Sequence, residues 1–328
     1  MRIAINGFGR IGRSVLRQLM TTRKDTPLQV VAINDIAPLD ALAYLLRYDS
    51  VFGPYPGQID TDGDTLVVDG HRIKVTQTAD QGELDLTGID LLMECTGKVK
   101  SREDVSRGLE AGAGKVLVSG PCEGDVPTVV LGANEDIMGN ARVISNASCT
   151  TNAMAPLLAV IDRTVGIETG HMTTVHCYTN SQPMVDGPRG DFARSRAGAV
   201  SMVPTTTSAT KLVDRVLPQL AGRLSGAAIR VPTPSVSCVD MVLQTRRDLP
   251  SDAVRWLRDL AQDSPVLGVT DDPVVSADMR MRPESLVIAL PETQCVGTRQ
   301  IRIFGWYDNE WGFSARMIDM ALRMGGKA

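Results

Sequence analysis

The first part of the chain alternates between short apolar runs and stretches with helical periodicity. The run RIAIN at residues 2–6 precedes a glycine-rich turn, after which Ile11, Val15, Leu16 and Leu19 recur on one helical face. Further apolar runs lie at residues 28–35, 89–97 and 115–121, helical patterns at 41–49 and 101–112, and a hairpin pattern at 64–75 with its turn at Asp69-Gly70. Because strands alternate with helices, this part predicts a doubly wound, Rossmann-type parallel sheet of the α/β class.

The pattern then changes in character. Met154, Leu157, Leu158 and Ile161 repeat at helical spacing, so an amphipathic helix is predicted over residues 152–161. Longer alternating, β-branched runs follow at residues 166–179, 226–247 and 299–310, with a loop at 180–211 and a final helix at 312–325. Alternation of this kind is typical of a mostly antiparallel sheet with one covered face. A loop of that length, rich in Pro, Gly, Ser, Thr and Arg, is usually functional or at an interface.

Composition narrows the class of protein. The 328 residues are long enough for two domains, and 43% hydrophobic with 22% charged residues is ordinary globular composition. A net charge of −4 gives no electrostatic reason to expect nucleic acid or an anionic membrane as a partner. No apolar run approaches the roughly 20 residues of a membrane helix, and the first residues lack the apolar segment of a signal peptide. The expected location is therefore the cytoplasm.

The glycine-rich turn has the spacing of a dinucleotide-binding motif. Gly7, Gly9 and Gly12 form G-x-G-x-x-G between the first strand and the first helix, and Asp35 ends the next strand. Glycines let the main chain approach a pyrophosphate at a helix N-terminus, and the carboxylate can bind the ribose hydroxyls. An acidic residue there disfavours the 2′-phosphate of NADP, so the predicted cofactor is NAD. The alternative is a structural turn followed by a surface aspartate.

Cys149 precedes the predicted helix of residues 152–161. The six cysteines are scattered without a C-x-x-C pair or a Cys/His cluster, which argues against a disulfide scaffold and against a zinc site. A thiol at a helix N-terminus feels the positive end of the helix dipole, so we expect a lowered pKa and a nucleophilic thiolate. The alternative for Cys149 is a small buried packing residue.

A nucleophilic thiol needs a base, and the chain has three histidines. Alternation places four residues on one strand face, namely Met172, Thr174, His176 and Tyr178. His171 is expected to be exposed and His71 to lie in the hairpin, so His176 is the candidate base, the alternative being a structural histidine. Such a pair in an NAD enzyme suits aldehyde oxidation, in which the thiolate adds to the carbonyl, hydride leaves and a thioester remains. Water or phosphate must then release the acyl group.

Several motifs together resemble the phosphorylating glyceraldehyde-3-phosphate dehydrogenase family over essentially the whole chain. They are INGFGRIGR, YDSVFG, ECTG, SNASCTTN, TTVH, RVPTPSVS and WYDNEWGFS, in the family's order and approximate spacing. The resemblance implies an NAD-binding domain at 1–148 completed by a C-terminal helix at 310–328, a catalytic domain at 149–309, and a homotetramer. It also implies the glycolytic oxidation and phosphorylation of glyceraldehyde 3-phosphate to 1,3-bisphosphoglycerate, with NAD and inorganic phosphate.

The resemblance also implies roles for individual residues. Cys149 would be the nucleophile, His176 its partner, and Thr179 and Arg230 the ligands of the substrate phosphate. Inorganic phosphate would be held by Ser148, Thr150, Thr207 and Arg196, with Ser208 beside them. The cofactor would be bound by Gly7, Gly9, Gly12, the backbone of Arg10 and Ile11, Asp35, Ser119, and Asn309 on the nicotinamide carboxamide. The loop at 180–211 is similar to the family's S-shaped loop near a neighbouring subunit's cofactor, and its Pro188 to that of NAD-using members.

Four positions depart from the family's usual residues. Ser208 replaces a glycine beside the expected phosphate site, Phe313 a tyrosine, Ala79 an arginine near the adenine, and Ile288 an aspartate. An altered phosphate site leaves open erythrose-4-phosphate dehydrogenase, a sister family in which water releases the acyl group. A third possibility is a regulatory protein without turnover, although retention of Cys149 and His176 argues against it.

Overall fold

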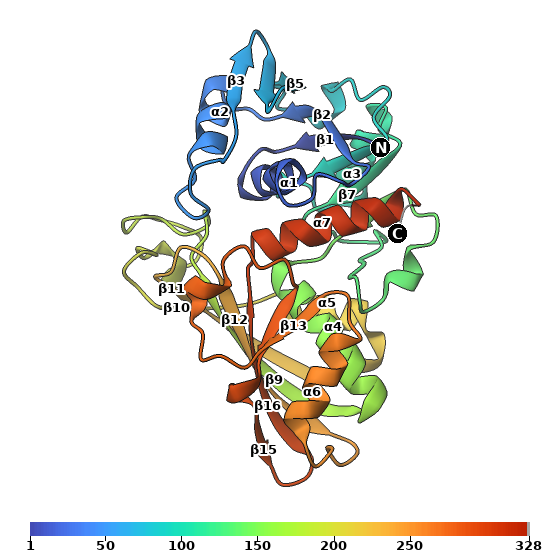
Figure 1. Cartoon of the computed structure of the whole chain (residues 1–328), viewed down its shortest axis with the longest axis vertical. Helices are drawn as coiled ribbons and strands as arrows, with labels where there is room; N and C mark the ends of the chain where they lie inside the picture. Colours follow the sequence, from blue (N-terminus) through green and yellow to red (C-terminus); the bar gives the residue numbers. More distant parts are fainter. Residues whose placement is uncertain (327–328) are drawn as a thin grey trace. The chain divides into compact units, whose positions relative to one another are not determined.

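The computed structural model describes residues 1–326, so the last two residues of the predicted C-terminal helix lie outside the described part (Figure 1). The chain divides into two compact units. Unit 1 comprises Met1–Val129, Asp136–Ala147 and the chain from Phe313 onward, and unit 2 comprises Val130–Glu135 and Ser148–Gly312. Within the described residues, no helix is both long and apolar enough to cross a membrane.

Unit 1 is built on an eight-stranded sheet in the order β3-β4-β5-β2-β1-β6-β7-β8. The strands are β1 (Arg2–Asn6), β2 (Gln29–Asn34), β3 (Ile59–Asp62), β4 (Thr65–Val68), β5 (His71–Thr76), β6 (Leu91–Glu94), β7 (Lys115–Val118) and β8 (Val143–Ser145). The six strands from β5 to β8 in this order pair in parallel, while β3 and β4 add an antiparallel edge. The strand order reverses beside β1, which confirms the predicted doubly wound fold.

The helices of unit 1 begin and end close to the predicted positions. They are α1 (Arg10–Met20), α2 (Leu39–Arg47), α3 (Arg102–Glu110) and, from Phe313 onward, α7 (Trp311–Met324). Ser101 and Asp104 cap the start of α3 reciprocally, each accepting the other's backbone N–H. The turn between β4 and β5 has positive φ at both Asp69 and Gly70, as the tight hairpin turn requires.

Unit 2 is built on a second, mostly antiparallel sheet in the order β10-β11-β9-β12-β16-β14-β13, with β15 paired to β16. Its strands are β9 (Ile167–Cys177), β10 (Val203–Thr205), β11 (Leu224–Val231), β12 (Ser237–Thr245), β13 (Leu267–Thr270), β14 (Leu286–Ala289), β15 (Gln294–Val296) and β16 (Gln300–Tyr307). β11 pairs with β9, and β13 with β14, in parallel. The predicted run at 226–247 is two strands, because Pro232 and Pro234 interrupt the ladder.

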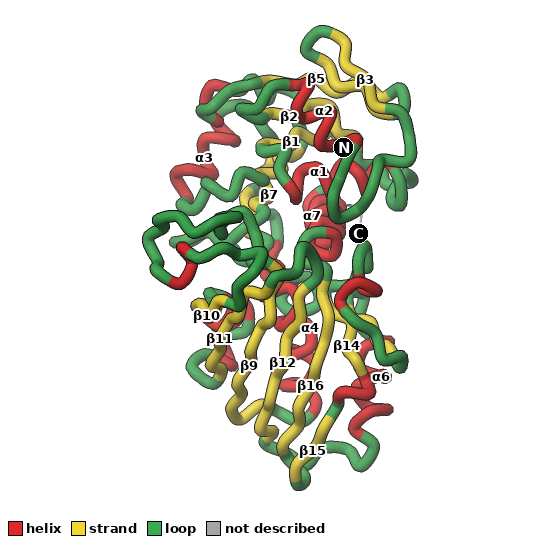
Figure 2. Tube along the Cα trace, turned by 90° about the vertical axis from the view of Figure 1, so that its left-hand side faces the viewer, coloured by secondary structure: helices red, strands yellow, loops and turns green. Residues whose placement is uncertain are grey.

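Helices α4 (Cys149–Thr164), α5 (Ala209–Val216) and α6 (Ala253–Gln262) pack against this sheet (Figure 2). The predicted apolar stripe of α4 is buried, with Met154, Leu157, Leu158 and Ile161 at most 1% exposed. Burial of four such side chains stabilises the helix by several kcal/mol relative to exposed ones, at roughly 1.5–3 kcal/mol each. The stripe therefore holds the start of α4, and with it Cys149, at a defined place on the sheet.

Candidate active site

Unit 1 contains a cavity of about 360 Å³ at the carboxyl ends of its central parallel strands. Gly7, Gly9, Asp35, Ala79 and Thr96 are among the residues that line it. Doubly wound sheets bind their ligands at this edge, where the strand order reverses. The predicted glycine motif and the predicted acidic residue thus line one cavity.

The glycine loop has no room for side chains at two of its three glycines. Gly7 has φ +89°, and a Cβ there would lie 2.6 Å from the backbone nitrogen of Thr96. A Cβ on Gly12 would lie 2.3 Å from the carbonyl oxygen of Gly7, whereas Gly9 has open space around it. Gly9 is the N-cap of α1, so the first backbone N–H groups of that helix, Arg10 and Ile11, are placed to bind a pyrophosphate. The loop therefore fits a dinucleotide.

The Asp35 carboxylate accepts hydrogen bonds from the glycine-rich turn and from the segment that follows β2. Its Oδ2 accepts the backbone N–H of Phe8 at 2.7 Å, and its Oδ1 accepts that of Ala37 at 3.0 Å. The carboxylate is half-buried and each oxygen keeps a further lone pair, which suits hydrogen bonds from ribose hydroxyls. The Arg10 side chain forms an ion pair with Asp49.

A buried polar network lies at this strand edge, and sequence reasoning missed it. The Glu94 carboxylate accepts the side-chain N–H of Asn6 at 2.5 Å, the backbone N–H of Thr96 at 2.8 Å and the Thr96 hydroxyl. Nδ2 of Asn34 donates to Oδ1 of Asn6 at 2.8 Å, and Oδ1 of Asn34 accepts the Thr78 N–H at 2.9 Å. Burial raises the pKa of Glu94. The network joins the ends of β1, β2 and β6 beside the glycine loop.

Ser119 follows β7, where its backbone N–H donates to the Glu94 carbonyl at 2.9 Å. It lines a different cavity, of about 340 Å³, together with Gly97, Val99 and Pro121. The structure thus places the predicted nicotinamide-side serine outside the lining of the first cavity.

Unit 2 brings the predicted thiol and imidazole together. Cys149 is the first residue of α4, and Ser148 caps that helix by accepting the backbone N–H of Thr151 at 3.1 Å. His176 lies on β9, and its Nε2 is 3.7 Å from Sγ of Cys149. This is the loose contact expected of a nucleophile and base before substrate binds.

The other ring nitrogen of His176 has two neighbours. Nδ1 lies 2.7 Å from the Cys177 carbonyl oxygen and 2.6 Å from Nη1 of Arg230, which also donates to that carbonyl at 2.9 Å. The Cys177 carbonyl oxygen can only accept a hydrogen bond. When Nδ1 of His176 pairs with this oxygen, Nδ1 therefore carries the ring proton, and Nε2 can take the proton of the thiol. Arg230 can only donate, so its contact favours the opposite tautomer. Arg230 is the register partner of His176 in the β9–β11 pair.

The electrostatics of the pair differ from the expectation. Burial raises the pKa of the Cys149 thiol, against the opposing effects of a hydrogen bond with Thr150 and the charge of Arg230. The predicted lowering of this pKa is therefore wrong for the chain by itself, because loss of water outweighs the helix end. Burial, and after it the charge of Arg230, lowers the pKa of His176 to about 4. At neutral pH the pair is a thiol facing an uncharged imidazole, which is the form that can accept a proton.

Comparisons with known proteins agree with this arrangement. Residues 1–102 match the family model described as glyceraldehyde 3-phosphate dehydrogenase, NAD binding domain, and residues 148–309 match the C-terminal domain of the same enzyme. The chain is 47% identical to glyceraldehyde-3-phosphate dehydrogenase of Pseudomonas aeruginosa, with 99% of this chain and 98% of that one covered. It is 46% identical to that of Cereibacter sphaeroides, with the same coverage. The chain is 41% identical to glyceraldehyde-3-phosphate dehydrogenase 2 of Bacillus subtilis, with 98% of this chain and 95% of that one covered.

The chain belongs to the glyceraldehyde-3-phosphate dehydrogenase family. The predicted resemblance is confirmed, and the match to the NAD binding domain supports NAD as the cofactor.

The hydroxyl of Thr150 points into the interior rather than toward a ligand. Thr174 donates its hydroxyl to the Cys238 carbonyl at 3.0 Å, so its oxygen accepts from Tyr307 at 2.9 Å. Tyr307 in turn accepts from Thr150 at 2.9 Å. Because the Thr150 hydroxyl is already engaged by Tyr307 and by Cys149, a phosphate near α4 would meet its backbone N–H and not its hydroxyl.

Tyr307 is a site residue that sequence reasoning missed. Its ring stands edge-on to His176, with centroids 6.0 Å apart. The strict alternation of burial along β16 is the signal that could have placed Tyr307 on the inner face.

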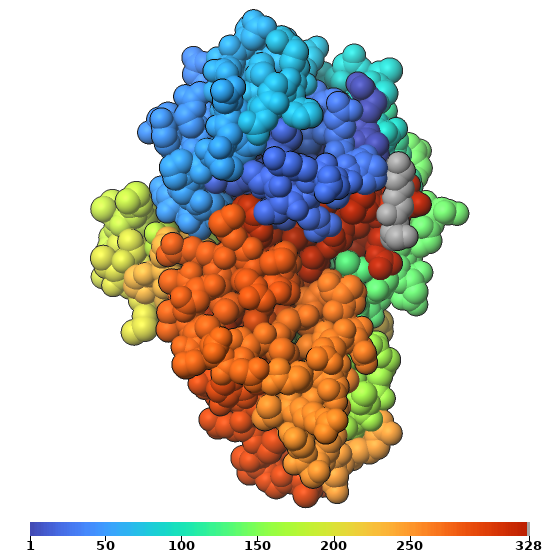
Figure 3. Space-filling view, in the orientation of Figure 1, coloured from blue at the N-terminus to red at the C-terminus, as the bar shows by residue number. Residues whose placement is uncertain are grey.

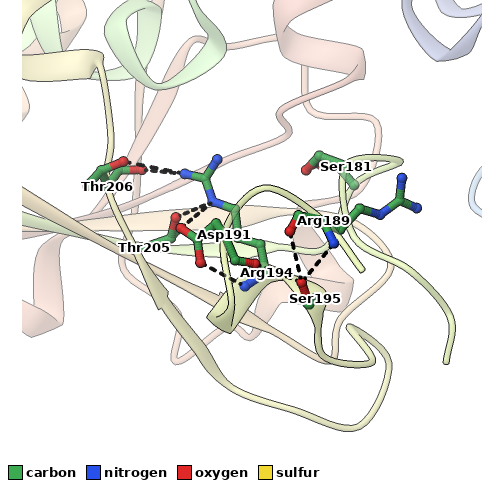
Figure 4. A network of polar contacts seen from close by, with 8 residues as sticks. Ser181, Arg189, Asp191, Arg194, Ser195, Thr205 and Thr206 are labelled. Atoms are coloured by element: carbon green, nitrogen blue, oxygen red, sulfur yellow. Dashed lines mark hydrogen bonds and ion pairs between the residues drawn. The ribbon is translucent and has the colours of Figure 1, made fainter. Parts of the chain in front are cut away.

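The arginine that contacts Thr205 and Thr206 is Arg194 of the Arg-rich loop, residues 180–211, and not the predicted Arg196 (Figure 4). Nε of Arg194 lies 2.5 Å from the Thr205 hydroxyl, and its Nη2 lies 3.4 Å from the carbonyl and hydroxyl oxygens of Thr206. The predicted phosphate ligand Arg196 is instead paired with Asp186 at 2.7 Å, and 65% of its side chain is exposed. Arg194, not Arg196, therefore lies beside the segment of residues 205–208, which contains the predicted phosphate ligands Thr207 and Ser208.

The remaining predicted residues of unit 2 lie at the ends of elements. Thr179 follows β9, with its hydroxyl 2.9 Å from that of Ser181. Thr207 accepts the Ala209 N–H at 3.1 Å at the start of α5, and the exposed Ser208 makes no side-chain cap to that helix. Asn309 follows β16 and contacts Cys177 and Ser237.

The departures from the family pattern fall in separate places. Ala79 lines the dinucleotide cavity, Ile288 is fully buried in β14, and Phe313 is buried in α7. Only Ser208, which is exposed beside Thr207, bears directly on the expected phosphate site.

Proposed function

We propose that this protein oxidises glyceraldehyde 3-phosphate with NAD and phosphorylates it to 1,3-bisphosphoglycerate through a thioester on Cys149. The observation that carries the proposal is the Cys149–His176 pair at the start of α4 in a chain of this family. His176 Nε2 takes the thiol proton as the sulfur adds to the aldehyde carbon. The resulting hemithioacetal loses a hydride from that carbon and its hydroxyl proton, which leaves the thioester. NAD, when bound, is the hydride acceptor. Inorganic phosphate then attacks the thioester carbon, and the Cys149 thiolate leaves.

The residues divide into four groups in this proposal. Cys149 and His176 react, while Thr179 and Arg230 bind the substrate phosphate. Inorganic phosphate is held by Ser148, the N–H of Thr150, Thr207, Ser208 and Arg194, with Arg194 in place of Arg196. The cofactor is held by Gly7, Gly9, Arg10, Ile11, Gly12, Asp35, Ser119 and Asn309. The proposed domains are 1–148 with 310–328 for the cofactor and 149–309 for catalysis.

The assembly proposed is a homotetramer in the cytoplasm. The loop at residues 180–211, drawn yellow-green in Figure 3, carries five exposed large apolar side chains, each at least 74% exposed: Met184, Val185, Phe192, Val200 and Met202. Isolated exposed apolar residues are ordinary, but five within one loop indicate a surface that another chain covers. Sedimentation velocity tests this proposal, and a monomer at micromolar concentration would contradict it.

The decisive assay measures NADH formation from glyceraldehyde 3-phosphate, NAD and phosphate. We expect turnover that depends on phosphate and that Cys149→Ser abolishes, because an alcohol is a far weaker nucleophile than a thiol paired with a base. Cys295→Ser, at an exposed thiol on β15, is the matched control and should keep full activity. Negligible turnover, or a rate indifferent to phosphate, would refute the proposal.

Hydrolytic release of the acyl group is the rival reaction, and the relatives named above do not support it. Parallel assays with erythrose 4-phosphate, with and without phosphate, separate the two. Ser208→Gly tests the one altered position at the phosphate site: KM for phosphate should rise several-fold if the Ser208 hydroxyl helps to hold phosphate, and fall if its hydroxymethyl group hinders phosphate.

A further inference from the structure

The side-chain amide of Asn309 is held at one end by two neighbours. Its Oδ1 lies 3.2 Å from Sγ of Cys177 and 3.2 Å from the hydroxyl oxygen of Ser237. Cys177 and Ser237 are 1% and 0% exposed, and Asn309 is 7% exposed. The contacts join the ends of β9 and β12 to the segment that follows β16.

The directions of these hydrogen bonds follow from a third contact. The backbone N–H of Cys177 donates to the Ser237 oxygen at 3.2 Å, so the proton of that hydroxyl is free to go to Asn309. Burial raises the pKa of Cys177 to about 12, so its thiol also keeps a proton to donate. Two donors require an acceptor, so the amide oxygen of Asn309 faces Cys177 and Ser237. Nδ2 consequently faces the opposite way.

The main chain on either side of Asn309 is also fixed. Asp308 is buried, and its carboxylate accepts the backbone N–H groups of Met281 at 2.9 Å, Glu310 at 3.0 Å and Trp311 at 2.8 Å. This arrangement caps the start of α7 and leaves the Asn309 backbone little freedom. Only rotation of the amide itself could exchange its donor and acceptor ends.

We propose that Cys177 and Ser237 are positioning residues that fix the amide of Asn309 so that it can only donate a hydrogen bond to the nicotinamide carboxamide. This inference rests on the proposed function, in which Asn309 meets that carboxamide. A fixed donor recognises the carbonyl oxygen of the carboxamide and does not need its NH₂ group. The site should therefore accept a cofactor analogue in which a methyl ketone replaces the amide.

The test is direct binding, without turnover, of NAD and of 3-acetylpyridine adenine dinucleotide, measured by isothermal titration calorimetry. The wild type should bind the two with dissociation constants within a few-fold of each other. The double variant Cys177→Ala/Ser237→Ala frees the amide to turn, so that it can either donate to the carboxamide oxygen of NAD or accept from its NH₂ group. The analogue can still bind only the donor orientation, so the ratio of its dissociation constant to that of NAD should rise about twofold, because NAD then has two productive orientations of the amide and the analogue has one.

Two further variants separate positioning from general damage. Cys177→Ser keeps a donor beside Oδ1 and should leave the ratio at the wild-type value. Cys238→Ala removes a buried thiol from β12 and keeps the carbonyl that accepts the Thr174 hydroxyl, so it should also leave the ratio unchanged. If the double variant does not fold, Ser237→Ala alone should raise the ratio by a smaller factor.

The outcomes distinguish this inference from the proposed function. A wild type that binds NAD and forms NADH, with an unchanged ratio in a folded double variant or in Ser237→Ala, overturns the positioning role alone. A wild type that binds neither dinucleotide overturns both.

Discussion

The dinucleotide cavity of unit 1 and the thiol site of unit 2 are built in different ways. The first depends on main-chain groups of one short stretch, residues 6–12, where Gly7 and Gly12 leave no room for a side chain. The second depends on side chains from several elements that are distant in sequence, with Cys149 on α4, His176 on β9 and Arg230 on β11. Substitutions in the first site should strain the loop and lower the affinity for NAD, whereas substitutions in the second should lower kcat.

The largest effect that tests this difference is expected from His176→Asn. Removing the base should lower kcat on the order of 10²- to 10⁴-fold, while the dissociation constant for NAD stays within about twofold. Steady-state kinetics and calorimetric NAD binding measure the two quantities. His171→Asn is the matched control, because His171 is exposed on the same strand and contacts Ser225. An equal loss of NAD affinity in His176→Asn would contradict the separation.

The unfolding free energy of the protein at acid pH should depend on the protonation of the His176 imidazole. The pKa of His176 lies at about 4 in the folded chain, below its ordinary 6.5, so the unfolded chain takes up the proton first as the pH falls. Relative to His176→Asn, the wild type should therefore lose up to about 3 kcal/mol of unfolding free energy between pH 6.5 and 4, and nothing above pH 7. Urea denaturation across this range, at one protein concentration, measures the difference. A difference independent of pH would show that His176 is not buried in the uncharged form.

Gly7→Ala tests the main-chain design of unit 1. A Cβ at φ +89°, 2.6 Å from the Thr96 nitrogen, must displace the loop, at a cost of roughly 1–3 kcal/mol. NAD affinity should fall about tenfold or more, while the rate of iodoacetamide labelling of Cys149 in the cofactor-free protein should not change. Gly63→Ala is the control, because Gly63 also has positive φ but nothing within 4 Å of its Cβ position. Normal NAD affinity in a folded Gly7→Ala would refute the close approach of the loop to the cofactor.

The smallest effect is expected from Tyr307→Phe. The change removes the hydroxyl that links Thr150 to Thr174 and should cost about 1 kcal/mol of unfolding free energy. kcat should change less than tenfold, because Thr150 regains a free hydroxyl without moving Cys149. Tyr44→Phe, at an exposed tyrosine, should leave both quantities at the wild-type values. A loss as large as that of His176→Asn would mean that Tyr307 takes part in the chemistry.

Much of the fold could be predicted because it follows from local pattern. Alternation of apolar runs with helices predicted the doubly wound sheet, and the stripe from Met154 to Ile161 predicted the buried face of α4. The strand face that carries His176 was also predicted, because side-chain direction alternates along a strand. The break at Pro232 and Pro234 was missed, although proline cannot donate to a sheet ladder.

The details of the site could not be predicted, because they depend on contacts between distant segments. Periodicity places Arg230 on β11 but does not reveal that its register partner is His176. The choice between Arg194 and Arg196 depends on how the loop folds over β10, and spacing alone cannot distinguish two arginines two residues apart. The Tyr307–Thr150 contact likewise joins residues more than one hundred and fifty positions apart.

The sequence by itself determined the two-part α/β organisation, the glycine loop, Cys149 at a helix start and the strand face that carries His176, because these follow from spacing, turn chemistry and helical or strand period. Only the tertiary structure decided how that thiol titrates. A helix end predicts a lowered pKa for Cys149, whereas burial in the folded chain raises it and keeps His176 uncharged. Burial is a property of all the segments packed around a group, so no local pattern contains it.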